Sequence, residues 1–276
     1  MRRYQKYLLA MAGLVLFGVF GGGKMVSYGE EQYGGEQYRG EQYKEEQSGE
    51  EQFGEEQSGE EQYGPGVALR RSEDQEKIQK LELEEDVTSV IYVRADERES
   101  SEVTVSFHTK GTAGSWNEEF SVSGLCGRNG STTKKAEGDG KTPLGTYRFT
   151  MAFGTEEDPG SLFPYHTLTK YDYWVDDQES SHYNKLVDVR KVEKDWKSAE
   201  AMASILPQYR YGLALDYNGD CTPGKGSAIF LHCMKEGDTG TSGCIAIPED
   251  TMKYLITVAD ENTRIVIDSG IGQGES

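Results

Sequence analysis

A cysteine and a histidine twelve positions apart carry the clearest chemical signal in this sequence. The segment SAIFLHCMKEGDTGTSGCIAIPED has His232 at the end of one apolar run and Cys244 at the start of the next. A cysteine nucleophile needs thiolate character, and a nearby imidazole supplies it by accepting the thiol proton. Gly243, directly before the cysteine, lets backbone N–H groups approach a developing oxyanion with no Cβ in the way. The pair therefore predicts nucleophilic acyl transfer, with an accessible thiol at Cys244 and His232 as its base.

A purely structural interpretation of the same residues is also open. A cysteine before an apolar run often packs into a core, and a single histidine is often buried with a structural partner. The other histidines, His108, His166 and His182, have no partner pattern and are expected to be surface or core residues. No CxxC or Cys/His spacing is present, so the sequence predicts no structural metal, and we expect no cofactor.

The segment resembles the catalytic motif of the L,D-transpeptidase family, the YkuD-like domain. In that motif a histidine and a variable loop precede Ser/Thr-His-Gly-Cys. Thr241, Gly243 and Cys244 match the pattern, and His232 matches the family's catalytic histidine. Further similar segments follow in family order and extend the resemblance over about residues 87–268: GDGKTPLGTY (138–147), YWVDD (173–177) with Tyr183-Asn184, and PGKGSAIFLH (223–232).

The sequence departs from the family pattern around the nucleophile. Ser242 replaces the histidine that usually precedes the Gly-Cys pair, and Ala246 replaces an asparagine or arginine common two positions after the cysteine. The loop between His232 and Cys244 is also shorter than in the best-known members. These departures affect the substrate contacts of the loop and leave the nucleophile and the base in place.

The resemblance implies a two-step acyl transfer on peptidoglycan stem peptides. Cys244 would attack the third residue of a tetrapeptide stem, release the terminal D-alanine and form a thioester. A side-chain amine of a neighbouring stem would then resolve the thioester as a 3→3 cross-link. His232 would act as base and acid in turn, oriented by a backbone carbonyl. We expect the N–H groups of Gly243 and Cys244 to form the oxyanion hole, with Thr241 and Ser242 in the same loop, and a carbapenem to be an inhibitor.

Four further residues are candidates for substrate binding. Asp176, Asp177, Tyr183 and Asn184 lie in a segment similar to the family, and an acceptor amine favours a nearby carboxylate. The alternative is that Asp176-Asp177 forms a turn and that Tyr183 only packs. Lys141-Thr142-Pro143 is expected to be a structural turn.

The remaining cysteines matter if the domain is exported, because extracytoplasmic compartments oxidise thiols. Cys126 and Cys221 could form a disulfide that spares Cys244, and Cys221 with Cys233 is the other option. We favour the first pairing because Cys233 lies beside the base.

Short β-rich runs predict a mainly β domain over residues 87–270, a YkuD-like β-sandwich with a few short helices, followed by a tail at 271–276. Two helices are expected, at Ser198–Leu206 and Glu249–Val258; the second has an apolar face and two acidic residues in its first turn. The expected strands are Val87–Val93, Val103–His108, Glu118–Val122, Thr146–Met151, Tyr209–Tyr217, Ser227–Cys233 and Arg264–Ile267.

The N-terminal region predicts export. Residues 1–24 combine basic residues with an uncharged, largely apolar run, as a signal does. The run is short for a membrane span and no A-x-A site follows, so we favour an uncleaved signal-anchor over a cleaved signal peptide. Residues 25–66 contain a five-residue acidic repeat that fits neither helix nor strand periodicity, and they are predicted to be a disordered spacer. Residues 67–86 are expected to be a linker or short helix.

The charge and the predicted location limit the partners. A formal charge of −19 at pH 7 argues against nucleic-acid binding, because the phosphate backbone would be repelled. We expect an extracytoplasmic monomer at the cell wall, secreted or membrane-anchored through its N-terminal segment. Two alternatives remain open: an L,D-carboxypeptidase or other hydrolase with the same Cys-His pair, and a catalytically inactive wall-binding surface protein.

Overall fold

The computed structural model describes residues 74–95 and 97–269. The predicted signal (1–24), the spacer (25–66) and the tail (271–276) lie outside the described residues. Of the predicted linker, residues 74–79 are helical and pack Ile78 against Val87 and Val90. Within the described ranges, no helix has both the length and the apolar character needed to cross a bilayer.

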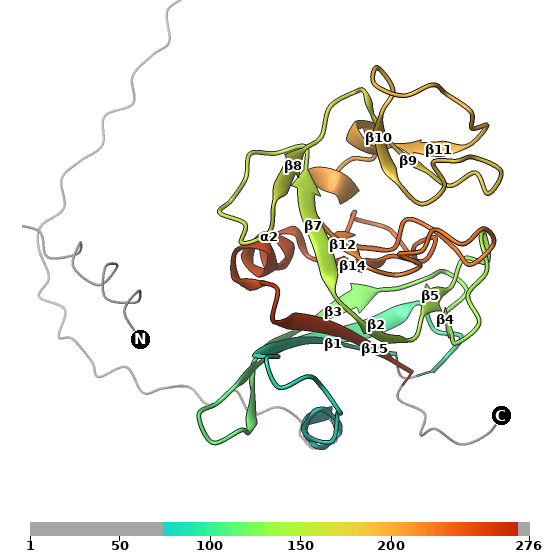
Figure 1. Cartoon of the computed structure of the whole chain (residues 1–276). Helices are drawn as coiled ribbons and strands as arrows, with labels where there is room; N and C mark the ends of the chain where they lie inside the picture. Colours follow the sequence, from blue (N-terminus) through green and yellow to red (C-terminus); the bar gives the residue numbers. More distant parts are fainter. Residues whose placement is uncertain (1–73, 96, 270–276) are drawn as a thin grey trace, which may run out of the picture. The chain divides into compact units, whose positions relative to one another are not determined.

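Ten strands form the main sheet, in the order β6-β15-β1-β2-β3-β14-β13-β12-β7-β8 (Figure 1). Every strand run that the sequence predicts overlaps one of them. They are β1 (Ser89–Ala95), β2 (Glu102–Lys110), β3 (Trp116–Leu125), β6 (Gly145–Tyr147), β7 (Phe149–Gly154), β8 (Tyr165–Thr167), β12 (Gly212–Leu215), β13 (Phe230–Cys233), β14 (Ile245–Ile247) and β15 (Thr263–Asp268).

The sheet divides into two halves that enclose one core. Among the described residues, a single pair, Ala246 with Leu125, joins β14 to β3. Apolar side chains from both halves belong to one buried cluster, which includes Ile91 of β1 and Leu213 of β12. The predicted mainly β, sandwich-like fold is therefore confirmed, and burial of this apolar surface is its main source of stability.

The helix α2 (Glu249–Val258) closes this core at the residues that the sequence predicts. Its Met252, Leu255 and Ile256 are fully buried. Glu249 and Asp250 lie in its first turn, where negative charge stabilises the exposed N–H groups.

The other predicted helix, Ser198–Leu206, is wrong. Residues Ala199–Ala201 form strand β11, followed by the short 3₁₀ helices η1 (Met202–Ser204) and η2 (Gln208–Arg210). Strand β11 pairs with β9 (Asp172–Val175), which also pairs with β10 (Leu186–Asp188), so tertiary pairing overrides the local helical pattern. A separate pair, β4 (Ser131–Thr132) with β5 (Thr142–Pro143), completes the described strands.

Candidate active site

The parallel pairing of β13 with β14 brings the two predicted catalytic residues onto one face. In the register of these strands, Leu231 lies opposite Ile245 and His232 opposite Ala246, which places Cys244 beside Phe230. Alternate residues of a strand share a face, so Cys244 and His232 lie diagonally across the ladder on the same side. A step of one strand and two residues separates their Cα atoms by about 8 Å, which side chains can span. His232 lies inside its strand and not at its end.

The Cys244 thiol, the predicted nucleophile, is less accessible than the sequence suggests. Cys244 is 6% exposed and His232 is 5% exposed. Cys244 belongs to a cluster with Phe153, Trp174 and Tyr209. The expectation of an open thiol is therefore wrong for this structure, because aromatic side chains from β7, β9 and η2 cover the β13 face.

Backbone groups nevertheless surround the sulfur. The Cys244 thiol donates to the carbonyl oxygen of Ala228 at 3.1 Å, and the Phe230 N–H donates to the sulfur at 3.4 Å. Ala228 has a φ of 54°, a left-handed conformation that is costly for a residue with a Cβ. The fold therefore strains one peptide beside Cys244, whose thiol donates to its carbonyl.

The His232 ring has one nitrogen bound to the backbone. Its Nδ1 lies 2.8 Å from the carbonyl oxygen of Cys233, so the expected backbone carbonyl partner is present. A carbonyl can only accept, so Nδ1 carries the proton and Nε2 of the neutral ring is left as an acceptor. Burial lowers the pKa of His232 to about 4, although the Cys233 carbonyl and Asp238 act in the opposite direction. The imidazole is therefore neutral at neutral pH and able to take a proton.

Burial and charge control the thiol. Burial raises the pKa of Cys244 strongly, the Glu200 carboxyl raises it further, and the Phe230 N–H and the Lys135 ammonium lower it. Glu200 accepts a hydrogen bond of 2.5 Å from the Tyr209 hydroxyl. The Tyr209 ring also meets the His232 ring edge-on, with centroids 5.5 Å apart. The resting pair is therefore a neutral thiol beside a neutral imidazole.

The loop before Cys244 is held by internal hydrogen bonds. The Thr241 hydroxyl donates to the Cys244 carbonyl at 2.7 Å and accepts from the Gly243 N–H at 3.0 Å. Gly243 has a φ of 146°, and a Cβ there would lie 2.9 Å from the Lys141 carbonyl oxygen, so glycine is required. The Gly243 amide, an expected oxyanion donor, is thus engaged by Thr241. Ser242 is exposed and accepts a hydrogen bond from Arg128 at 2.9 Å.

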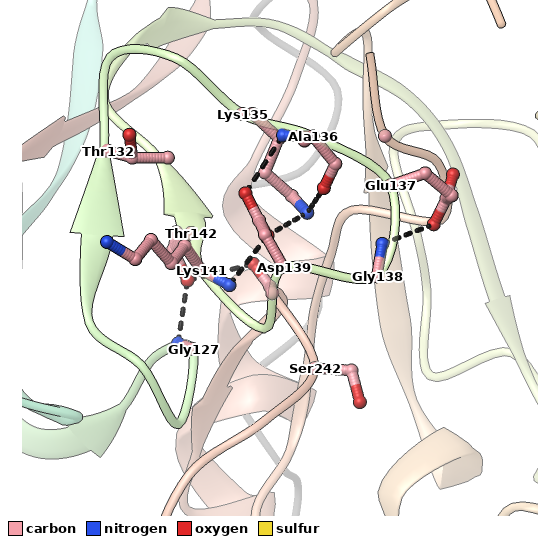
Figure 2. Close-up of polar contacts among 12 residues, drawn as sticks. Gly127, Thr132, Lys135, Ala136, Glu137, Gly138, Asp139, Lys141, Thr142 and Ser242 are labelled. Atoms are coloured by element: carbon pink, nitrogen blue, oxygen red, sulfur yellow. Dashed lines mark hydrogen bonds and ion pairs between the residues drawn. The ribbon is translucent and has the colours of Figure 1, made fainter. Parts of the chain in front are cut away.

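The GDGKTP segment (138–143), drawn in Figure 2, also supports the loop before Cys244. The side chain of Lys135 is only 3% exposed and pairs with Asp139 at 2.6 Å, and the Asp139 carboxylate also accepts the backbone N–H groups of Ala136 and Lys141. The Thr142 hydroxyl accepts from the Gly127 N–H at 2.8 Å and donates to the Gly243 carbonyl at 2.9 Å. The turn predicted at Lys141-Thr142-Pro143 is not found, because Thr142 and Pro143 form strand β5, and the Thr142 hydroxyl braces the loop before Cys244.

A family model of the L,D-transpeptidase catalytic domain, YkuD, matches residues 90–267. The matched range begins inside β1 and ends inside β15. The chain belongs to this family.

Solved structures similar to this YkuD domain are distant. The helical cell shape determining protein Pgp2 from Campylobacter jejuni is 17% identical, with a TM-score of 0.37; the match covers 66% of this chain and 48% of that one. An Enterococcus faecium L,D-transpeptidase mutant is 13% identical, with a TM-score of 0.29 and coverage of 64% and 49%. The chain thus matches about half the length of these proteins. A comparison with curated proteins finds no match.

The candidate substrate residues of the YkuD domain divide into different roles. The Asp177 carboxylate accepts the N–H groups of Glu179 at 3.0 Å and Lys197 at 2.7 Å, which lower its pKa and fit the turn interpretation. Tyr183 is 2% exposed and donates to Glu137 at 2.5 Å, so it packs inside the fold. Asp176 has one buried carboxylate oxygen, Oδ1, without a hydrogen-bond partner in the described part of the chain.

Asn184 contacts the backbone that holds the nucleophile. Its Oδ1 accepts from the Trp174 indole and from the Ala228 N–H, both at 3.0 Å. Its Nδ2 donates to two carbonyls in the turn after β12, at 3.0 and 3.3 Å. Because the Ala228 carbonyl accepts the Cys244 thiol, Asn184 acts on the nucleophile through this strained peptide. This contact is structural, and no substrate is needed to explain it.

The predicted Cys126–Cys221 disulfide is absent, and all four cysteines are free. The Cys126 sulfur lies against the carbonyls of Ser100 and Gly127, whereas the Cys221 sulfur lies near the carbonyls of Asn184 and Gly219. Cys233 is fully buried in the main core, and its sulfur lies near the Tyr211 carbonyl. Different elements therefore hold the three thiols, and the alternative Cys221–Cys233 pairing is absent as well.

Four residues were missed at the sequence level: Lys135, Glu200 and Tyr209 beside the pair, and Arg128 against the loop before Cys244. Glu200 lies in strand β11, where the local sequence pattern predicts a helix. Burial raises the pKa of Glu200 to about 7, and Asp176 and Glu137 contribute in the same direction.

No group of three or more potential metal ligands occurs among residues 74–95 and 97–269.

We predict that Asn184→Gly slows acylation of Cys244 by a carbapenem at least about tenfold, because small displacements of a nucleophile are costly. Glycine tolerates the φ of 56° at this position, so the backbone need not change. Alkylation by iodoacetamide needs no such alignment and should fall less. Both rates are followed by mass spectrometry of the Cys244 peptide.

The matched control is Asn218→Gly. Asn218 also has a positive φ, of 50°, and its side chain makes hydrogen bonds to Thr222 and Gly226 but none to Ala228. Equal acylation-to-alkylation ratios in the two variants would show that Asn184 does not position the thiol.

Proposed function

We propose that this protein is an L,D-transpeptidase that forms a Cys244 thioester with peptidoglycan tetrapeptide stems. The observation that carries the proposal is the parallel β13–β14 register, which puts Cys244 and His232 on one face of a family-matched domain. The carbonyl contact of His232 Nδ1 supports it, because this contact leaves Nε2 as the acceptor that a base requires.

In the first step, the Cys244 sulfur attacks the carbonyl carbon of the third stem residue while its proton passes to His232 Nε2. The bond from that carbon to the nitrogen of the terminal D-alanine breaks, and His232 protonates the departing amine. In the second step, the side-chain amine of a neighbouring stem attacks the thioester and gives its proton to His232. The carbon–sulfur bond then breaks, and the thiolate regains its proton.

The electrostatics favour proton transfer during attack over a preformed ion pair. Burial holds the thiol protonated and the imidazole neutral, so neither charge of a thiolate–imidazolium pair is stabilised at rest. The Lys135 ammonium and the Phe230 N–H offset part of this cost as negative charge develops on the sulfur. Entry of the peptide has to be coupled to movement of the aromatic cover, since the sulfur is buried.

We also propose that the domain works outside the cytoplasmic membrane, where peptidoglycan stems are found. The support is the signal-like segment at 1–24 followed by the acidic repeat, which suits an expanded tether.

Exposure of the full chain to a carbapenem should give an intact-mass increase of one carbapenem, because ring opening acylates one thiol. Cys244→Ala should abolish the adduct, and Cys221→Ala, which removes a half-buried thiol elsewhere, should retain it. Unchanged labelling of Cys244→Ala would rule out this residue as the nucleophile.

Incubation with purified tetrapeptide muropeptides should produce cross-linked dimers together with free D-alanine, resolved by liquid chromatography and mass spectrometry. Tripeptides without dimers would instead identify water as the acceptor and make the protein an L,D-carboxypeptidase. An absence of both products, with stable binding to cell-wall sacculi, would favour the inactive wall-binding protein.

The rate of Cys244 acylation should remain constant as the pH falls to about 5 and decline through about 4, where His232 becomes protonated. The sign follows from the lowered pKa, since the ring is neutral and basic above that value. His232→Ala should keep the circular dichroism spectrum and lose most turnover. A decline centred near 6.5, or full activity in His232→Ala, contradicts this role.

A further inference from the structure

Arg128 is an exposed cation beside the nucleophile loop that has no ion pair among the described residues. Its Nη1 donates instead to the neutral hydroxyl of Ser242 at 2.9 Å. Lys135, a cation near the same loop, differs in this respect because it pairs with Asp139. The full positive charge of Arg128 is therefore available to a ligand.

The backbone of Arg128 is held against the same loop. Its N–H donates to the Thr241 carbonyl, and the Thr241 N–H donates to the Cys126 carbonyl, both at 2.8 Å. A Cβ on Gly240 would lie 2.7 Å from the Arg128 Cα, and one on Gly140 would lie 3.2 Å from its Nε. The arginine is thus enclosed by two glycine-containing segments, which limits where its guanidinium can lie.

The position suits a group one residue away from the attacked carbonyl. Ser242 precedes Cys244 by two residues, a span of at most about 7 Å along the chain. The carboxylate of a terminal residue lies about one residue length, roughly 4 Å, beyond the carbonyl that the thiol attacks. A guanidinium bound to the exposed Ser242 can therefore meet that carboxylate while the sulfur meets the carbonyl.

The charge of the protein makes such a contact valuable. The chain has a formal charge of −19, so an anionic stem peptide gains little from the overall field and needs a local cation. Arginine presents a planar fork of donors that matches a carboxylate in a bidentate way. Lys141, in the neighbouring loop, does not offer this, because its side chain points away from Ser242 (Figure 2).

We propose that Arg128 binds the free terminal carboxylate of the donor stem and thereby selects stems that end one residue beyond the attacked carbonyl. This inference rests on the proposed function, since it assigns a specificity residue to the same site. Ser242 would position the guanidinium, and the terminal D-amino acid would carry the carboxylate away when it leaves.

The test compares a tetrapeptide stem with the same peptide whose terminal carboxylate is an amide. We expect the wild-type chain to have a higher kcat/KM for the acid, and Arg128→Gln to lower that value about 10- to 100-fold while leaving the amide substrate nearly unchanged. Arg128→Lys should give an intermediate value for the acid, because it keeps the charge and loses the fork. Lys141→Gln removes a neighbouring charge and should preserve the preference for the acid.

Equal slowing of both substrates by Arg128→Gln would reduce the residue to a structural role and overturn the inference. Equal use of acid and amide by the wild-type chain, or loss of the preference in Lys141→Gln, would overturn it as well. Carbapenem labelling of Cys244 is measured on each variant. A labelled wild-type chain without acid preference refutes only the role of Arg128, whereas an unlabelled wild-type chain refutes the proposed function itself.

Discussion

The site depends on the parallel ladder between β13 and β14. Parallel strands need a crossover connection, and here the connection is short and glycine-containing, with Gly237, Gly240 and Gly243 all at positive φ. The register of this ladder, with His232 opposite Ala246, decides that the sulfur and the imidazole share a face. A slip of one residue would turn Cys244 into the main core and leave His232 without a partner.

Several segments distant in sequence stabilise that register. Thr142 joins Gly127 to Gly243, the Arg128 N–H donates to the Thr241 carbonyl, and Asn184 holds the Ala228 peptide against the thiol. Each contact is a hydrogen bond between buried or half-buried groups, where an unpaired partner would be costly. The surrounding backbone therefore holds Cys244, the proposed nucleophile, in position.

Burial has opposite consequences for the two reacting groups. It raises the pKa of Cys244 and lowers the pKa of His232, so both are neutral at rest. In the proposed reaction, the cost is a weaker nucleophile, and the benefit is an imidazole that stays neutral over a wide pH range. The Glu200 carboxyl raises the pKa of the Cys244 thiol, and the Lys135 ammonium lowers it.

Local pattern was sufficient for part of this protein. The alternation and composition of the β-rich runs predicted most strands of the main sheet, but not β8 or β14. The apolar face predicted α2, and the spacing around Gly243-Cys244 with His232 identified the candidate pair. These signals are short-range, so they can be read from neighbouring residues. Tertiary structure decided the rest: that Ala199–Ala201 is a strand, that Glu200 and Tyr209 lie beside the pair and Arg128 against the loop before it, that the thiol is buried, and that no cysteines pair. Pairing between distant strands, desolvation and long-range charge determine those features, and no stretch of the sequence contains them by itself.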